Sequence, residues 1–114
     1  GEPIEALETP SSVTVPSSLV RPDNFVLQVK GQSMIDEQIQ DGDYIVVKKT
    51  ATARSGQIVV AIINDEATLK CYVPKSDRIE LHPRNPKFPI ITIKKTDNFY
   101  INGVLLYSFR EYAS

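Results

Sequence analysis

Hydrophobic positions recur with a period of two along much of this chain, and this pattern predicts short β-strands. In residues 25–30, for example, the alternation places Phe25, Leu27 and Val29 on one face of a strand. The run 57–63 is the most strongly strand-like and is expected to be central. Taken together, the apolar runs between turn-forming residues predict strands at 25–30, 44–48, 57–63, 67–73, 78–82, 90–94 and 103–109.

Turn signals separate several of these runs. Asp41-Gly42-Asp43 and Asn102-Gly103 are typical of tight turns, and Asn64-Asp65-Glu66 predicts a hairpin. Residues 33–40 have near-helical spacing and predict one short helical turn. Val and Ile together number 23 while Leu and Ala number 13, which also favours strands over helices. We therefore predict a mainly β fold, compact and strongly coiled, with a partial barrel and at most short helical turns.

The first 23 residues differ from the rest because they are rich in Pro and Ser. We predict that 1–23 form an extended arm lying on the domain, with a short strand near 13–15. Residues 24–114 then form the domain itself. A chain of 114 residues is long enough for one hydrophobic core and too short for two.

Charge and cysteine content exclude several classes of protein. The formal net charge of -1 argues against a free-standing nucleic-acid binder. One His and one Cys leave no His/Cys zinc site, and no motif for another metal or a cofactor is present. The apolar runs are far shorter than a bilayer span, and no signal peptide is visible, so we expect a cytoplasmic protein without membrane contact. The first residue is Gly1 and not Met, which suggests a fragment.

The segment Gly31-Gln32-Ser33-Met34 is the most informative for chemistry. From the pattern alone, Ser33 is best interpreted as an N-cap whose hydroxyl satisfies a free backbone N–H. The alternative is a nucleophile, with free N–H groups at the start of the turn binding an oxyanion. A nucleophilic serine needs a base. The single histidine, His82, lies between a strand and Pro83 without a nucleophile-elbow motif, so a Ser-His-Asp triad is poorly supported.

A lysine kept neutral by burial is the remaining type of base. Lys70 is a candidate because it lies mid-strand among neutral residues, with Thr68 and Tyr72 on the same face. The alternation by itself favours the simpler interpretation, a lysine on an exposed strand face.

The two candidates occur in an ordered set of motifs that resembles the self-cleaving repressor family containing LexA, phage repressors and UmuD. The set comprises Gly31-Gln32-Ser33-Met34, Asp41-Gly42-Asp43 and Ala67-Thr68-Leu69-Lys70, with Ser33 and Lys70 37 positions apart. Further agreement comes from 81–85, 88–90 and the strand beginning at Gly103. The resemblance extends from Gly1 to about Phe109 and implies coiled β-sheets with a partial SH3-like barrel, as in LexA and signal peptidases.

The resemblance also implies an activity. Ser33 and Lys70 would form the catalytic dyad of a self-cleaving serine endopeptidase, with the N–H groups of Ser33 and Met34 stabilising the oxyanion. LexA-like members cleave an Ala-Gly bond, and Gly1-Glu2-Pro3 resembles the start of their downstream product. We therefore expect Gly1 to be the new terminus left by cleavage. The implied partners are the RecA–single-stranded DNA filament as activator and operator DNA, the latter through an absent N-terminal domain.

Other interpretations remain open at this point. A processed UmuD-like chain would be an accessory protein of a translesion polymerase, and a phage repressor would carry an equivalent domain. A signal-peptidase-like enzyme also uses Ser and Lys, but those enzymes have a membrane anchor. The simplest alternative is a β-rich binding domain in which Ser33 is a cap and Lys70 is exposed.

The last predicted strand bears on oligomeric state. Both of its faces are largely apolar, since Val104 and Leu106 alternate with Leu105, Tyr107 and Phe109. A buried central strand explains this pattern without a partner. The resemblance implies instead a homodimer formed through the C-terminal strand, which would set the spacing of two DNA half-sites.

Overall fold

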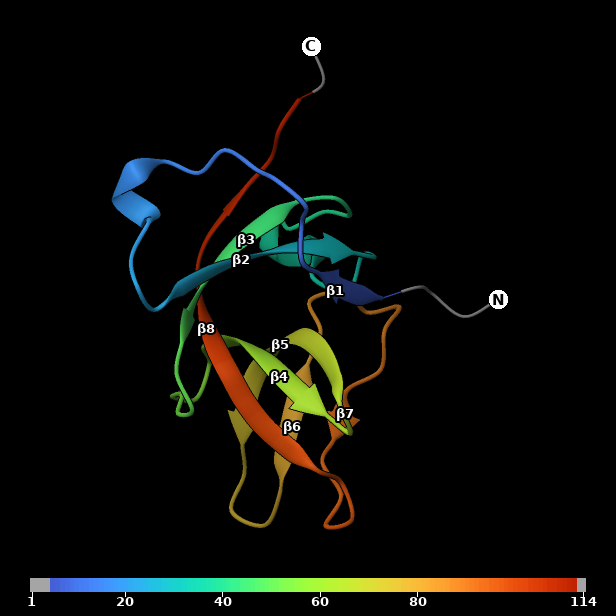
Figure 1. Ribbon diagram of the computed structural model, residues 1–114. Coiled ribbons are helices and arrows are strands. Elements are labelled where there is room, and N and C mark those ends of the chain that lie inside the picture. The colour runs from blue at the N-terminus through green and yellow to red at the C-terminus, as the bar shows by residue number, and fades with distance from the viewer. Residues whose placement is uncertain (1–4, 113–114) are drawn as a thin grey trace.

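The computed structural model describes residues 5–112, which form one strongly curled antiparallel sheet (Figure 1). The order of the strands across the sheet is β1-β2-β3-β8-β4-β5-β6-β7. The strands are β1 (Ala6–Glu8), β2 (Asn24–Lys30), β3 (Tyr44–Lys49), β4 (Ile58–Ile63), β5 (Glu66–Pro74), β6 (Ile79–His82), β7 (Ile91–Thr92) and β8 (Phe99–Phe109). Two 3₁₀ turns, η1 (Ser17–Leu19) and η2 (Ile35–Glu37), are the helical elements of this part of the chain. The predicted mainly β fold is confirmed.

The predicted turns at 41–43 and 64–66 are present, and left-handed backbone makes both of them tight. Gly42 has φ +90° and directs the chain into β3. Asn64 and Asp65 both have positive φ, as a two-residue hairpin between twisted strands requires, and β4 pairs with β5 across them. Because Asn and Asp tolerate this conformation better than most residues, the sequence encodes the hairpin locally.

The expected turn at Asn102-Gly103 is wrong, because both residues lie inside the long strand β8. This strand pairs with β3 along one part and with β4 along the other, and so joins the two halves of the sheet (Figure 1). A Cβ on Gly103 would lie 2.3 Å from Val47 Cγ1 and 2.7 Å from the Lys48 carbonyl oxygen. The glycine therefore allows close packing against β3, which a sequence signal for turns cannot distinguish from a turn.

The predicted strand at 13–15 is also absent, and the arm contributes β1 instead. Leu7 of β1 is opposite Val29 of β2, and Leu7 packs against the core. Pro10 and Pro16 flank residues 13–15 and have no N–H to donate to a ladder, which explains why the pairing lies earlier in the chain. The strand predicted at 90–94 is shorter than expected, with only Ile91–Thr92 paired.

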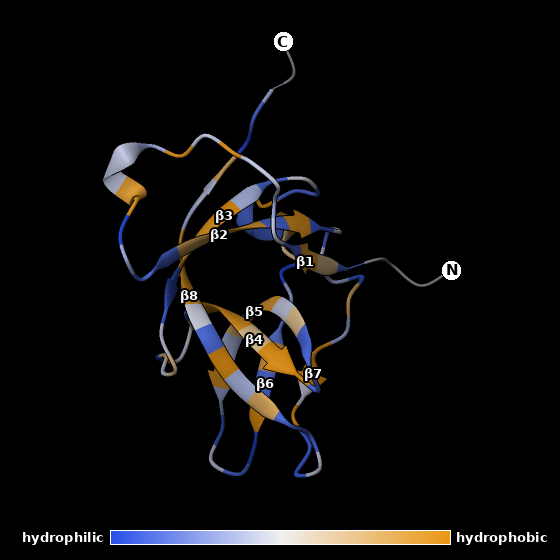
Figure 2. Ribbon diagram, in the orientation of Figure 1, coloured by the Kyte–Doolittle hydropathy of each residue, from blue (hydrophilic) through white to orange (hydrophobic). Residues whose placement is uncertain are grey.

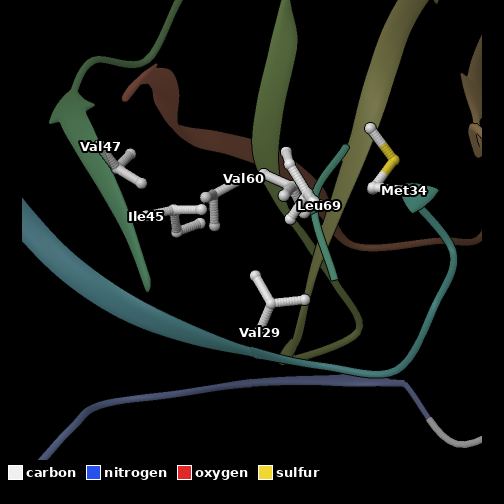
Figure 3. Packing of buried hydrophobic residues seen from close by; sticks show 7 residues of the cluster. Val29, Met34, Ile45, Val47, Val60 and Leu69 are labelled. Carbon is white, nitrogen blue, oxygen red and sulfur yellow. The ribbon is translucent and has the colours of Figure 1, made fainter. Parts of the chain in front are cut away.

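Two hydrophobic clusters lie on opposite faces of β4, since Val60 belongs to one and its neighbours Val59 and Ala61 belong to the other. One contains the β2 face predicted from the alternation, and Figure 3 shows its buried side chains packed between β2, β3, β4 and β5. The other lies under β4, β6 and β8 and includes Val59, Leu81 and Ile101. Figure 2 shows β4 as strongly hydrophobic, in agreement with its central position. The curl also brings β1, which is first in the order across the sheet, into contact with β5. The candidate site lies at this contact.

None of the helical segments within residues 5–112 has the length and apolar character needed to cross a membrane.

Candidate active site

Ser33 lies in the loop between β2 and β3, and its side chain is 4% exposed. The expectation that Ser33 is an N-cap is wrong: the N-cap position of η2 is Met34, and no side chain caps this turn. The loop is held instead by hydrogen bonds from residues outside it. The Ser33 carbonyl accepts a hydrogen bond from the Arg84 N–H at 2.7 Å, and the Gln32 carbonyl accepts one from Asn85 Nδ2 at 2.9 Å. Buried Met34 anchors the same loop in the core.

Lys70 lies on β5 and its side chain is 1% exposed, so the exposed lysine favoured by the alternation is wrong. Its Nζ donates hydrogen bonds to Ser33 Oγ at 3.3 Å, to Thr68 Oγ1 at 2.7 Å and to the Leu69 carbonyl at 3.2 Å. The face of β5 that carries Lys70 is covered because the sheet curls and brings the Ser33 loop and Glu5 over it. Ser33 and Lys70, 37 positions apart in sequence, are therefore direct neighbours.

Burial has a chemical consequence for the amine. Desolvation disfavours the ammonium form and lowers the pKa of Lys70 to about 8, from an ordinary value of 10.5. A lysine with this pKa has an appreciable neutral fraction near neutral pH, unlike an exposed lysine. Neutral Nζ can accept a proton from a hydroxyl 3.3 Å away, and this is what a general base requires.

Glu5 completes the cluster, although the sequence did not predict it as a site residue. Its Oε1 accepts hydrogen bonds from Ser33 Oγ at 3.1 Å and from Thr68 Oγ1 at 2.7 Å, and it forms an ion pair with Lys70. No local signal marks Glu5 in the sequence, because its partners are 28 to 65 positions away along the chain.

The predicted oxyanion donors are the backbone N–H groups of Ser33 and Met34. Among the hydrogen bonds within residues 5–112, none has the N–H of Ser33 or of Met34 as its donor. Both groups are thus unengaged by the described part of the chain, and their role as oxyanion donors stays a prediction. Gly1, the other sequence-predicted site position, lies outside the residues that the structure describes.

Comparison with known proteins shows the family of the chain. The family model described as Peptidase S24-like matches residues 1–106. The chain belongs to the Peptidase S24-like family. It is 50% identical over 115 residues to the LexA repressor of Syntrophotalea carbinolica, an alignment that covers 100% of this chain and 57% of that protein. It is 42% identical over 113 residues to the LexA repressor of Syntrophobacter fumaroxidans, covering 98% of this chain and 54% of the relative. The chain thus spans about half the length of the curated relatives it matches.

In this S24-like chain, the side chains of His82 and Cys71 make their contacts outside the Ser33–Lys70 cluster. His82 Nε2 contacts Glu80 Oε1 at 2.8 Å, and His82 takes no part in the hydrogen bonds of Ser33. Buried Cys71 follows Lys70 on β5, but its Sγ contacts Arg84 Nη2 at 3.1 Å. Between Glu5 and Tyr112, no group of three His, Cys, Asp or Glu side chains has the arrangement of a metal site.

An open hollow of about 420 Å³ adjoins the site on one side. Its lining combines apolar side chains with two carboxylates: Glu5, Ile63, Asn64, Glu66, Ala67, Thr68 and Ile91. Glu5 and Thr68 line the hollow and also contact Lys70, so the hollow adjoins the Ser33–Lys70 pair at these two side chains.

Proposed function

We propose that this chain is the self-cleavage and dimerisation domain of a LexA-like transcriptional repressor of the SOS response, acting as a serine endopeptidase with a Ser33–Lys70 dyad. The observation that carries the proposal is the buried contact of 3.3 Å between Lys70 Nζ and Ser33 Oγ in a chain of the Peptidase S24-like family. The names of the relatives support the repressor over the UmuD-like alternative, since those of S. carbinolica and S. fumaroxidans are both LexA repressors.

In the proposed reaction, Ser33 Oγ attacks the carbonyl carbon of the residue preceding Gly1, an alanine in LexA-like members. The Oγ–C bond forms, neutral Lys70 Nζ takes the hydroxyl proton, and the carbonyl electrons move to oxygen. The N–H groups of Ser33 and Met34 stabilise that oxyanion. The intermediate collapses with cleavage of the C–N bond, and Lys70 passes its proton to the amine of Gly1. Water then hydrolyses the acyl-enzyme, with Lys70 again accepting a proton.

The lowered pKa of Lys70 makes the reaction depend on pH and on burial. Below a pKa of about 8 the amine is mostly protonated and cannot act as a base; above it the amine is mostly neutral. Cleavage should therefore rise with pH through this range. A partner that favours docking of the scissile segment over Ser33 and Lys70 would keep Lys70 desolvated, and it would activate the chain by shifting a population that already exists. The RecA–single-stranded DNA filament is the activator that we propose.

The partners of the whole repressor follow from the same proposal. Operator DNA would be bound by a separate N-terminal domain, which agrees with the net charge of -1 on this chain. Homodimerisation would use the end of β8, where Leu106 and Tyr107 are exposed. No metal or cofactor is needed for the chemistry of a Ser-Lys dyad.

Cleavage in trans tests the proposal. The chain is incubated with a peptide that contains an Ala-Gly-Glu-Pro segment, and product is measured by mass spectrometry between pH 6 and 10. Ser33→Ala and Lys70→Ala should each abolish cleavage. Ser55→Ala and Lys95→Ala change the same residue types at exposed positions away from the site, and they should cleave as the wild type does. Normal cleavage by Lys70→Ala would rule out the dyad.

A further inference from the structure

The Glu5 carboxylate occupies the centre of the Ser33–Lys70 cluster. One oxygen, Oε1, pairs with Lys70 and accepts the hydroxyl hydrogen bonds of both Ser33 and Thr68. The side chain of Glu5 is 26% exposed, whereas that of Lys70 is 1% exposed. Glu5 is thus accessible to solvent, whereas the amine that it contacts is buried.

Strand pairing fixes Glu5 in this position. It directly precedes β1, where Ala6 is opposite Lys30 of β2, and β1 lies against β5, which carries Thr68 and Lys70. Glu5 therefore depends on the short β1 ladder for its position. It can leave the cluster if β1 separates from β2.

The other charged groups around Lys70 do not take the place of Glu5. On β5 itself, Glu66 is exposed and lines the adjoining hollow. On β4, the residue opposite Lys70 is Val59. Behind the Ser33 loop, the guanidinium of Arg84 is engaged by Glu37 Oε1 at 2.9 Å and by Cys71 Sγ. Among residues 5–112, Glu5 supplies the only carboxylate that pairs with Lys70.

Two effects of Glu5 oppose catalysis. A carboxylate in contact with an amine favours the ammonium form, so it works against the desolvation that makes Lys70 a base. In addition, the Ser33 hydroxyl proton is directed to Glu5 Oε1, whereas the general base must receive it. Both effects disappear when Glu5 leaves the site.

Glu5 also conflicts with the approach of the scissile bond. The bond that precedes Gly1 is four residues upstream of Glu5, or as much as about 14 Å of extended chain. Because Glu5 Oε1 lies 3.1 Å from Ser33 Oγ, it competes with a carbonyl group that approaches the same oxygen. The segment that carries Glu5 must therefore shift before the attack on that bond.

We propose that Glu5 is an inhibitory positioning residue: its carboxylate holds the dyad in an inactive state, and its withdrawal switches the dyad on. This inference rests on the proposed function of the Ser33–Lys70 dyad. It assigns to the arm a regulatory role at the catalytic groups themselves. It also predicts that the chain keeps its own site occupied when no substrate is bound.

The experiment compares the wild-type chain with Glu5→Gln, which keeps the size of the side chain and removes its charge. Glu8→Gln is the matched control, because it removes the same charge from an exposed position three residues away. The rate of trans cleavage of the Ala-Gly-Glu-Pro peptide is measured against pH. In Glu5→Gln the midpoint of the profile should fall by about one pH unit, which corresponds to about tenfold faster cleavage well below the midpoint. Glu8→Gln should keep the wild-type midpoint.

A second measurement separates this inference from the proposed function. The chain is labelled with ¹⁵N-lysine, the side-chain signal of Lys70 is assigned by its loss in Lys70→Arg, and the signal is titrated in the wild type and in Glu5→Gln. A lower pKa of Lys70 in Glu5→Gln supports the inference even if no peptide is cleaved. An unchanged pKa, or an unchanged cleavage midpoint in an enzyme that still needs Ser33, would overturn it. Cleavage that persists in Ser33→Ala would refute the proposed function and leave the titration to decide the role of Glu5.

Discussion

Asp43 and Arg110 join the catalytic loop to the C-terminal end of the sheet. The Arg110 guanidinium donates to both carboxylate oxygens of Asp43, with Nε at 2.6 Å from Oδ1 and Nη2 at 2.9 Å from Oδ2. Asp43 ends the loop that begins at Gly31 and holds Ser33, and it also accepts the Gln40 N–H at 2.8 Å. Arg110 directly follows β8. One planar, two-point contact thus fixes the loop relative to the strand through which we propose dimerisation.

Replacing Arg110 with Ala should destabilise the fold and make it sensitive to acid. Burial by itself raises the pKa of Asp43, but the Arg110 hydrogen bonds, the Gln40 N–H and the Arg110 charge together lower that pKa below 3.8. Because the folded-state pKa is lowered, the pair stabilises the protein above pH 3.8, and this stabilisation disappears as pH falls through the folded-state value. Without Arg110, the pKa of Asp43 rises and stability is lost at higher pH.

Thermal unfolding between pH 3 and 7 measures this effect. Arg110→Ala should lower Tm at pH 7 and shift the acid transition upward, whereas Arg21→Ala, at an exposed position, should leave both close to wild type. Equal acid transitions in Arg110→Ala and Arg21→Ala would show that the ion pair does not set the pKa of Asp43.

Gly103→Ala should destabilise the protein by about 1–3 kcal/mol, because the new methyl group overlaps β3. Its Cβ would lie 2.3 Å from Val47 Cγ1 and 2.7 Å from the Lys48 carbonyl oxygen. The side chain of Val47 can be shortened, but the carbonyl belongs to a paired backbone. Adding Val47→Ala should therefore relieve only part of the loss. Urea unfolding of the two variants provides the measurement, and a Gly103→Ala value within about 0.5 kcal/mol of wild type would contradict the close packing.

The sequence predicted the local features of the fold and missed those that depend on distant contacts. Alternation located β2, β3, β4, β5 and β6 because each has an apolar face and a turn with suitable residues beside it. It missed β1, whose three residues are held by backbone pairing with β2 rather than by a pattern of their own. It misread Gly103, because glycine serves turns and close strand packing alike.

The same difference between local features and distant contacts is clearer at the candidate site. Alternation placed Lys70 on a strand but predicted exposure, because that face is covered only through the curl of the sheet, which brings Glu5 and the Ser33 loop over it. Capping statistics favoured a structural role for Ser33, and the resemblance to a family, not the pattern, paired it with Lys70. Glu5 could not be found at all, since its contact with Lys70 spans 65 positions.

Lys70→Met should stabilise the protein at neutral pH. Burial lowers the folded-state pKa of Lys70 to about 8, whereas the unfolded chain keeps a value near 10.5. The unfolded state therefore binds more protons between pH 8 and 10.5, and the contribution of Lys70 to stability improves as pH rises through this window. Below pH 8 the full cost of burying the charge remains, and it is on the order of 3 kcal/mol. Methionine has similar length and no charge, so it avoids this cost.

Urea unfolding at pH 7, 8, 9 and 10 tests the stabilisation by Lys70→Met. The advantage of Lys70→Met over the wild type should be largest at pH 7 and shrink steadily towards pH 10. The exposed-site variant Lys95→Met should show no such trend. A constant difference across this range would mean that the pKa of Lys70 is the same in the folded and unfolded states.

Tyr107→Asp should convert the proposed homodimer to monomers. Tyr107 is 53% exposed in the last part of β8, next to Leu106, where an apolar pair faces solvent in the single chain. A charge there opposes burial against a second copy but costs the folded monomer little. Phe109 is a poorer choice, because its ring stacks on Tyr44 at 5.3 Å between centroids, so that replacing it also disturbs the monomer.

Tyr100 offers a matched control on the same strand. It is 52% exposed, almost as much as Tyr107, but it lies in the part of β8 that pairs with β4, far along the strand from Leu106. Sedimentation equilibrium of the two variants compares the two surfaces directly. We expect Tyr107→Asp to be monomeric and Tyr100→Asp to dimerise as the wild type does. The reverse result would place the dimer interface at the opposite end of β8, and loss of dimers in both variants would mean that a single charge anywhere on this strand prevents association.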